Sequence, residues 1–138
     1  MIEFPVNTYP KGSEKQVSAN FQVHEFECPC KNCSETLIAP RLLELLEDLR
    51  VRFGMPIQIH SGYRCRNHQD ELRAQGYETA KGISSHEQGW AADLSVPGCS
   101  GIELSLLARF VGFMAVGTAP TWIHVDLRQG KERRWIYS

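Results

Sequence analysis

Two short stretches of the sequence contain residue types that bind zinc. His86 and Asp93 are seven residues apart, a spacing that suits a loop leading into a strand better than one turn of a helix. Imidazole and carboxylate groups suit Zn²⁺, which takes three or four ligands in a tetrahedron. His124 offers a third ligand far along the chain, and Asp126 follows it on the same face of a strand-like run. The pattern predicts a zinc site formed by His86, Asp93 and His124.

The elements expected around these residues are consistent with such a site. His86 lies in a loop to which Gly89 gives backbone freedom, and Asp93 lies just inside a strand. His124 lies within an apolar strand, where an imidazole is costly unless it has a partner. The combination of a loop and two strands favours a built site over three unrelated polar residues.

The periodicity of apolar residues predicts an α+β fold. The clearest helix covers 39–53, with Pro40 in its first turn and Gly54 as its stop. Before the predicted metal site we expect a strand over 55–61, a short helix over 66–74 and a loop over 77–85. A strand over 91–96 and a largely buried helix over 101–116, ended by Gly117, follow. The last two elements are strands over 121–128 and 134–137, which we expect to pair as a hairpin. This order predicts a small, mostly antiparallel sheet with flanking helices.

Length and composition indicate one globular domain. The 138 residues suffice for one core, with residues 1–19 as an arm of little regular structure and 20–138 as the domain. The net charge of −1 gives no electrostatic case for nucleic acid or an anionic membrane. No run approaches the ~18–20 apolar residues of a membrane span, and the first residues do not resemble a signal peptide. We therefore expect a cytoplasmic monomer, unless another system exports it.

Three of the five cysteines form a second cluster of metal-binding residues. Cys28, Cys30 and Cys33 lie within six residues, and the odd total argues against a complete disulfide framework. One interpretation is a structural zinc site with Cys65 or a nearby histidine as the fourth ligand. The alternatives are a reduced, cysteine-rich loop and a redox or metal-storage role.

Three motifs in order resemble one family. The run from Ser84 to Asp93 matches the pattern SxHxxGxAxD, the segment 61–64 reads SGYR, and 122–126 reads WIHVD. Over residues 20–128 the chain therefore resembles the zinc D-alanyl-D-alanine carboxypeptidases of the VanX/VanY group, whose fold is shared with the hedgehog signalling domain. The resemblance implies a hedgehog/DD-peptidase-like fold that carries Zn²⁺.

The resemblance also implies a substrate and a mechanism. The substrate would be a peptidoglycan stem peptide, or another peptide that contains D-amino acids, cut by metal-activated water. Arg64 matches the arginine of the SGYR motif and would hold the oxyanion or the substrate carboxylate. Ser84 would hydrogen-bond a ligand or the substrate, or would serve only as a turn residue.

The general base departs from the family pattern. Family members commonly place a Glu, Asp or His two or three residues before the third ligand, where this chain has Thr121 and Trp122. Asp126 is the best substitute, because it shares a strand face with His124 within about 7 Å. It could instead be a carboxylate that orients a metal ligand. Glu87, beside His86, is a weaker candidate.

The sequence is compatible with two functions. The first is a zinc peptidase. It could be a D-Ala-D-Ala carboxypeptidase, a cytoplasmic dipeptidase, or an endolysin-like enzyme of a phage or prophage that acts on the cell wall. The second is a non-catalytic zinc-binding domain of the same fold that binds cell-wall peptide or a protein partner. The missing base favours the second, and an open metal position beside Arg64 favours the first.

Overall fold

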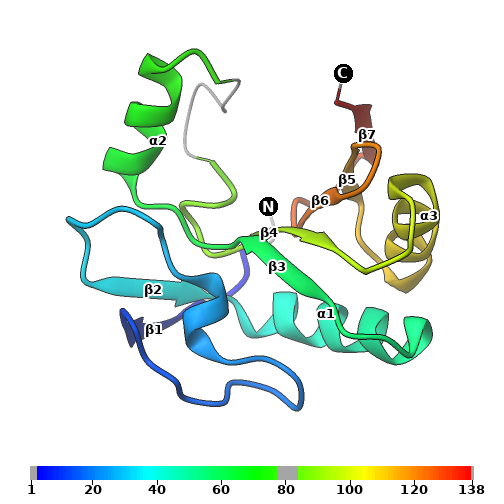
Figure 1. The fold of residues 1–138 in the computed structure, drawn as a ribbon, viewed down its shortest axis with the longest axis horizontal. Coiled ribbons are helices and arrows are strands. Elements are labelled where there is room, and N and C mark those ends of the chain that lie inside the picture. Colours follow the sequence, from blue (N-terminus) through cyan, green and yellow to red (C-terminus); the bar gives the residue numbers. More distant parts are fainter. Residues whose placement is uncertain (1–2, 78–83, 138) are drawn as a thin grey trace.

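The computed structural model describes residues 3–77 and 84–137 and has the expected α+β architecture (Figure 1). Its elements in chain order are β1 (Asn7–Pro10), the short 3-10 helix η1 (Val23–Phe26), β2 (Glu35–Ile38), α1 (Pro40–Phe53), β3 (Gln58–Ser61), α2 (Arg66–Ala74), β4 (Ala91–Ser95), α3 (Gly101–Val111), β5 (Ala115–Thr118), β6 (Ile123–Asp126) and β7 (Arg133–Ile136). Strands β1 and β2 form a small antiparallel pair, and the other five form the main sheet.

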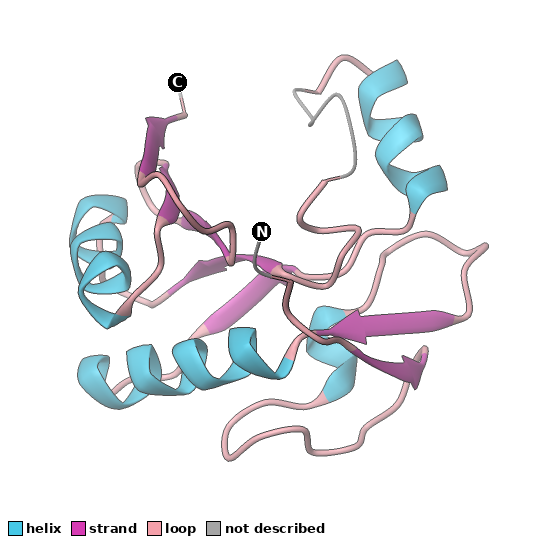
Figure 2. Cartoon of the chain, turned by 180° about the vertical axis from the view of Figure 1, so that it is seen from behind, coloured by secondary structure: helices cyan, strands magenta, loops and turns pink. Residues whose placement is uncertain are grey.

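The main sheet separates an apolar face from a polar one. Its strand order is β3-β4-β6-β5-β7, and only the β5–β7 pair is parallel. Leu94 on β4 and Val125 on β6 point into the core that α1 and α3 help to form. Because side chains alternate along a strand, the neighbouring Asp93 and His124 point to the opposite face. Helix α2 stands on that side, away from α1 (Figure 2).

Helix α1 supplies much of the core, as the sequence predicts. Pro40 occupies the first turn, and Gly54 ends the helix in a left-handed conformation at φ 68°. Five leucines of the helix are buried: Leu42, Leu43, Leu45, Leu46 and Leu49. Neither α1 nor any other helix in the described part of the chain combines the length and apolar character needed to cross a membrane.

The helix expected over 101–116 is shorter, and the part of the prediction beyond Val111 was wrong. Gly112, at φ 124°, ends α3, and residues 115–118 form strand β5 inside the sheet. The apolar run over 113–116 suits a buried strand as well as a buried helix, so periodicity does not separate the two. The helix is also less buried than expected, because Ile102, Leu106 and Phe110 are exposed.

Strand β7 does not form the expected hairpin with β6. It pairs in parallel with β5 instead, and the Trp135 ring occupies the space beside Gly117. A Cβ at Gly117 would lie 2.4 Å from Trp135 Nε1, so this glycine permits the close packing and does not cap a helix.

The N-terminal arm has more regular structure than expected. Residues 7–10 pair with β2, and the Phe4 ring packs edge-on against Trp90, with ring centroids 5.7 Å apart. Phe21, Val23 and Phe26, which follow the arm, are buried in the core. The loop expected over 77–85 falls mainly on 78–83, outside the described residues.

Two leucines of α3 provide a matched test of its orientation. Leu104 is fully buried, whereas Leu106 is 56% exposed. We expect Leu104→Ala to lower the free energy of unfolding by about 2–5 kcal/mol and Leu106→Ala to change it by less than about 0.5 kcal/mol. Urea unfolding followed by circular dichroism measures both. Equal losses would contradict the orientation of α3.

Candidate metal centre

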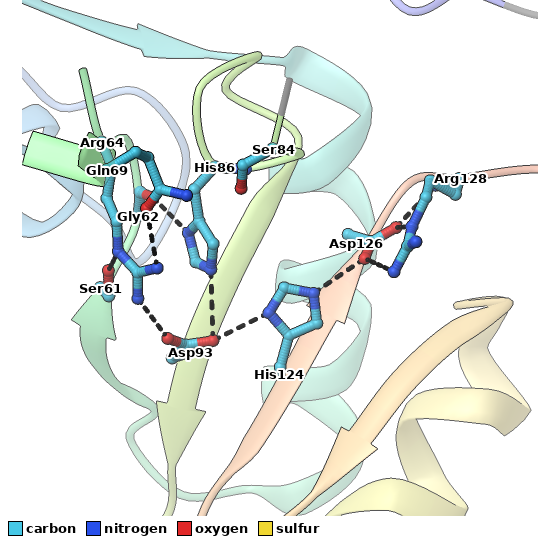
Figure 3. Close-up of polar contacts among 10 residues, drawn as sticks. All are labelled: Ser61, Gly62, Arg64, Gln69, Ser84, His86, Asp93, His124, Asp126 and Arg128. Atoms are coloured by element: carbon cyan, nitrogen blue, oxygen red, sulfur yellow. Dashed lines mark hydrogen bonds and ion pairs between the residues drawn. The ribbon is translucent and has the colours of Figure 1, made fainter. Parts of the chain in front are cut away.

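The three predicted zinc ligands converge on the polar face of the sheet (Figure 3). His86 Nε2 lies 3.5 Å from Asp93 Oδ1, and His124 Nδ1 lies 2.9 Å from the same oxygen. One donor atom from each residue falls within 4.8 Å of the other two. His86 and His124 are buried, and Asp93 is nearly so.

The pairing of two strands sets two of these positions. Asp93 and His124 are direct partners in the antiparallel β4–β6 ladder. Directly opposite residues have Cβ atoms about 4.5–5.5 Å apart on one face, so their side chains meet without further support.

The third position depends on the turn before β4. The Ser84 hydroxyl accepts a hydrogen bond from the His86 backbone N–H at 3.1 Å, as in a turn, and its role toward a ligand or substrate stays a prediction. Gly89 adopts φ 74°, and a Cβ there would lie 2.6 Å from the Leu37 carbonyl oxygen. The serine and glycine of the SxHxxGxAxD motif therefore both shape the turn that presents His86.

Each histidine is held through the ring nitrogen that faces away from the centre. His86 Nδ1 donates to the Gly62 carbonyl at 2.6 Å, which leaves Nε2 facing Asp93. His124 Nε2 lies 2.8 Å from Asp126 Oδ2, on the far side of the ring from Asp93 (Figure 3). Backbone carbonyls and carboxylates commonly orient metal-bound histidines in this way.

Asp126 is buried and fully engaged. Its Oδ1 accepts from the Arg128 backbone N–H at 2.9 Å and from Arg128 Nε at 3.0 Å. Its Oδ2 accepts from Arg128 Nη2 at 2.9 Å in addition to its contact with His124. These contacts favour the orienting role that the sequence left open for Asp126, and its role as general base stays a prediction.

The ionisation of His86 and of the two carboxylates suits a cation. Burial lowers the pKa of His86, which keeps this imidazole neutral and able to bind metal. Burial alone would raise the pKa of both carboxyl groups. For Asp93 the interactions with His124 and His86 outweigh burial and lower the pKa. For Asp126 the hydrogen bonds with His124 and Arg128 outweigh burial and lower the pKa to about 2. Burial alone would lower the pKa of His124, but its bonds to Asp126 and Asp93 raise it. Both carboxylates are therefore ionised at neutral pH.

The donor set fits zinc. Tetrahedral zinc with bonds of about 2.1 Å to nitrogen and oxygen places its donor atoms about 3.4 Å apart. The separations of 3.5 and 2.9 Å between the histidine nitrogens and Asp93 Oδ1 are close to that value. His86, Asp93 and His124 are therefore the residues that would hold the ion.

Arg64 lies beside Asp93 and uses all three of its nitrogens. Nη2 donates to Asp93 Oδ2 at 2.9 Å, Nε to the Ser61 hydroxyl at 2.9 Å and Nη1 to the Gln69 side chain at 3.2 Å. The side chain is still 19% exposed. Its predicted role toward substrate stays a prediction, and its visible role is to fix the second oxygen of Asp93.

A cleft of about 950 Å³ opens above the centre, and it includes residues that the sequence analysis did not single out. Arg128, Gln69, Trp135 and Tyr137 line it together with the three ligands and Arg64. Arg128 forms an ion pair with Asp126. The sequence could have indicated this pair, because two residues that are two positions apart on a strand share one face. Glu87 pairs with Arg66 at 3.2 Å and is not among the described residues that line the cleft, which disfavours it as a base.

A buried His–Asp–His cluster below a cleft in a small α+β fold is an arrangement typical of metal-dependent hydrolases. The model of one family, described as peptidase M15, matches residues 19–126. The chain therefore belongs to the peptidase M15 family, which confirms the resemblance that the three motifs indicated.

Curated relatives agree with this assignment. Proteins named peptidoglycan L,D-endopeptidase MepK, from Escherichia coli strain K12 and from Shigella flexneri, are each 32% identical to this chain over 102 residues. The matched region covers 71% of this chain and 54% of each relative, so the chain spans about half the length of these curated relatives.

Removing either histidine tests the metal centre. We expect His86→Ala and His124→Ala each to bind one zinc fewer per chain than the wild type, since two ligands rarely hold zinc. Saturating zinc should also raise the melting temperature of these variants less than that of the wild type. Elemental analysis and thermal scans measure both effects, with His24→Ala, at an exposed histidine, as the control. Unchanged zinc content in both variants would contradict the ligand assignment.

Proposed function

We propose that the protein is a zinc-dependent peptidase that hydrolyses peptidoglycan stem peptides, or other peptides that contain D-amino acids. The observation that carries the proposal is the buried cluster of His86, Asp93 and His124 at a cleft lined by cations. Membership of a peptidase family and the peptidoglycan endopeptidase name of the relatives support this substrate class.

The hollows around the centre favour cleavage within a peptide rather than at its end. A second hollow of about 880 Å³ shares Asp93 and Trp122 with the cleft above the centre. His60, Ser95 and Ser100 also line this second hollow. Because open space lies on both sides of Asp93, a substrate chain can extend in both directions from the bond that is cut. We therefore favour an endopeptidase over a D-Ala-D-Ala carboxypeptidase.

The charge of the cleft suits a substrate rich in carboxylates. Arg64, Arg128 and Arg133 line it, while Asp93 and Asp126 are the only acidic residues among its described lining residues. A guanidinium binds a carboxylate through two parallel hydrogen bonds, which orients the substrate as well as attracting it. Trp135 and Tyr137 add an aromatic wall beside these cations.

The roles of the residues follow from their contacts. Bound zinc would supply Lewis acidity, which polarises a peptide carbonyl and lowers the pKa of water. His86 and His124 stay in place because Gly62 and Asp126 hold their outer ring nitrogens. Arg64 and Arg128 are the nearest cations for the developing negative charge or a substrate carboxylate.

Purified peptidoglycan tests the proposal. We expect the zinc-loaded protein to release new amino groups from it, and a chelator to abolish the release because the reaction depends on the metal. Mass spectrometry of the products should show cleavage within the stem peptide. Free D-alanine as the sole product would contradict the endopeptidase and support a carboxypeptidase. Absence of any release by zinc-loaded protein would contradict the peptidase.

Asp126→Asn separates an orienting role from general-base catalysis. We expect the dissociation constant for zinc to rise about 10–100-fold, because the carboxylate no longer holds His124 Nε2. Turnover at saturating zinc should then largely recover. Unchanged zinc affinity together with lost turnover would instead assign the base to Asp126. Competition with a chromophoric chelator gives the affinity, and Asp70→Asn on the exposed face of α2 is the matched control.

A non-catalytic zinc-binding domain is the second candidate. The observation in its favour is that Asp126, the one lining carboxylate besides Asp93 among the described residues, is fully hydrogen-bonded and lies behind His124. Such a domain would bind stem peptide or a protein partner at the same cleft. Zinc-dependent binding of peptidoglycan fragments without any hydrolysis would support it.

A further inference from the structure

Four cysteine thiols from two segments that are distant in the sequence converge in space. Cys28, Cys30 and Cys33 lie in the loop between η1 and β2, and Cys65 immediately precedes α2. The Cys30 and Cys33 sulfurs are 3.3 Å apart, Cys30 and Cys65 are 3.4 Å apart, and Cys28 and Cys65 are 3.8 Å apart. All four sulfur atoms lie within 4.8 Å of one another.

These separations match a shared metal ion better than paired disulfides. Tetrahedral zinc with bonds of about 2.3 Å to sulfur places its thiolates about 3.8 Å apart. A disulfide joins two sulfurs at about 2.05 Å, and two separate disulfides need not lie in contact with each other. Cys30 touches both Cys33 and Cys65, so the four thiols surround one centre instead of forming two separate pairs.

The surroundings of the thiols suit a charged cluster. Cys28 is fully buried, and the other three thiols are partly buried. The Lys11 ammonium donates to the Cys33 sulfur at 3.4 Å and also to the Cys30 carbonyl. Four thiolates around Zn²⁺ carry a net charge of about −2, and a neighbouring ammonium offsets part of it.

We propose that Cys28, Cys30, Cys33 and Cys65 bind a second zinc ion in a closed structural site. Four cysteine ligands leave no position for water or substrate, so this ion would contribute stability and not catalysis. The site does not depend on the proposed peptidase activity, because it shares no residue with the cluster of His86, Asp93 and His124.

Cys65 links the proposed second zinc site to the first centre, because the residues just before it in the chain hold two of the ligands of that centre. The adjacent Arg64 holds Asp93, and the Gly62 carbonyl, three residues before Cys65, holds His86. In the same segment the Tyr63 N–H donates to the carbonyl of Phe26 at 2.8 Å, close to the start of the cysteine loop. The second ion would therefore lock the cysteine loop onto the segment that orients two ligands of the first centre.

Metal content and cobalt spectra test the second site. We expect two zinc ions per chain in the wild type and in the control Cys99→Ser. We expect one in His86→Ala and in the double loop variants Cys28→Ser/Cys30→Ser and Cys30→Ser/Cys33→Ser, because each double variant keeps only two of the four thiols. Cobalt-substituted wild type and His86→Ala should show the thiolate-to-cobalt charge-transfer band, which should be absent from both loop variants. A single zinc in the wild type, with the band missing, would overturn the proposal whatever the peptidase assay shows.

Counting thiols in the wild type covers the case in which the loop variants do not fold. In zinc-loaded native protein at most one thiol, that of Cys99, should react with a thiol reagent, and denaturation in chelator without reductant should expose all five. Fewer than five reactive thiols after denaturation would mean disulfides, and five in the native protein would mean unbound thiols. Either result would overturn the proposal.

Discussion

The antiparallel pairing of β4 with β6 sets the geometry of both the metal centre and the apolar core. It places Asp93 directly opposite His124 and, by the alternation of side chains, turns Leu94 and Val125 into the core. The same ladder therefore builds the polar centre and the apolar interior. A slip of one residue in its register would exchange the two faces, so burial of the core fixes the geometry of the ligands.

The polar face stays stable because its charges are paired before any metal binds. Asp93 pairs with Arg64 and His124, and Asp126 pairs with Arg128 and His124. An isolated buried carboxylate would cost several kcal/mol, and these pairs offset much of that cost. The pairs also fix the rotamers of the ligands, so a cation meets a site that is already arranged.

The sequence pointed to the residues of the metal centre and to α1 more clearly than to the end of α3 and to strands β5 and β7. His86, Asp93 and His124 stand out because they are metal-binding residue types within two recognisable motifs, and α1 stands out because its leucines recur at helical spacing along its length. The end of α3 and strand β5 were missed because residues 113–116 are apolar under either assignment. The parallel pairing of β7 depends on Trp135 packing over Gly117, a contact between distant segments that spacing does not encode. The role of Cys65 was left open for the same reason, because only the tertiary fold brings it to Cys30.

Anomalous X-ray diffraction at the zinc absorption edge would show whether His86, Asp93 and His124 hold zinc together. In crystals of the zinc-loaded protein, we predict a strong peak within about 2.2 Å of His86 Nε2, Asp93 Oδ1 and His124 Nδ1. Asp126 should still contact His124 Nε2 on the opposite side of that ring. Density for these three side chains with no anomalous peak between them, at saturating zinc, would contradict the account.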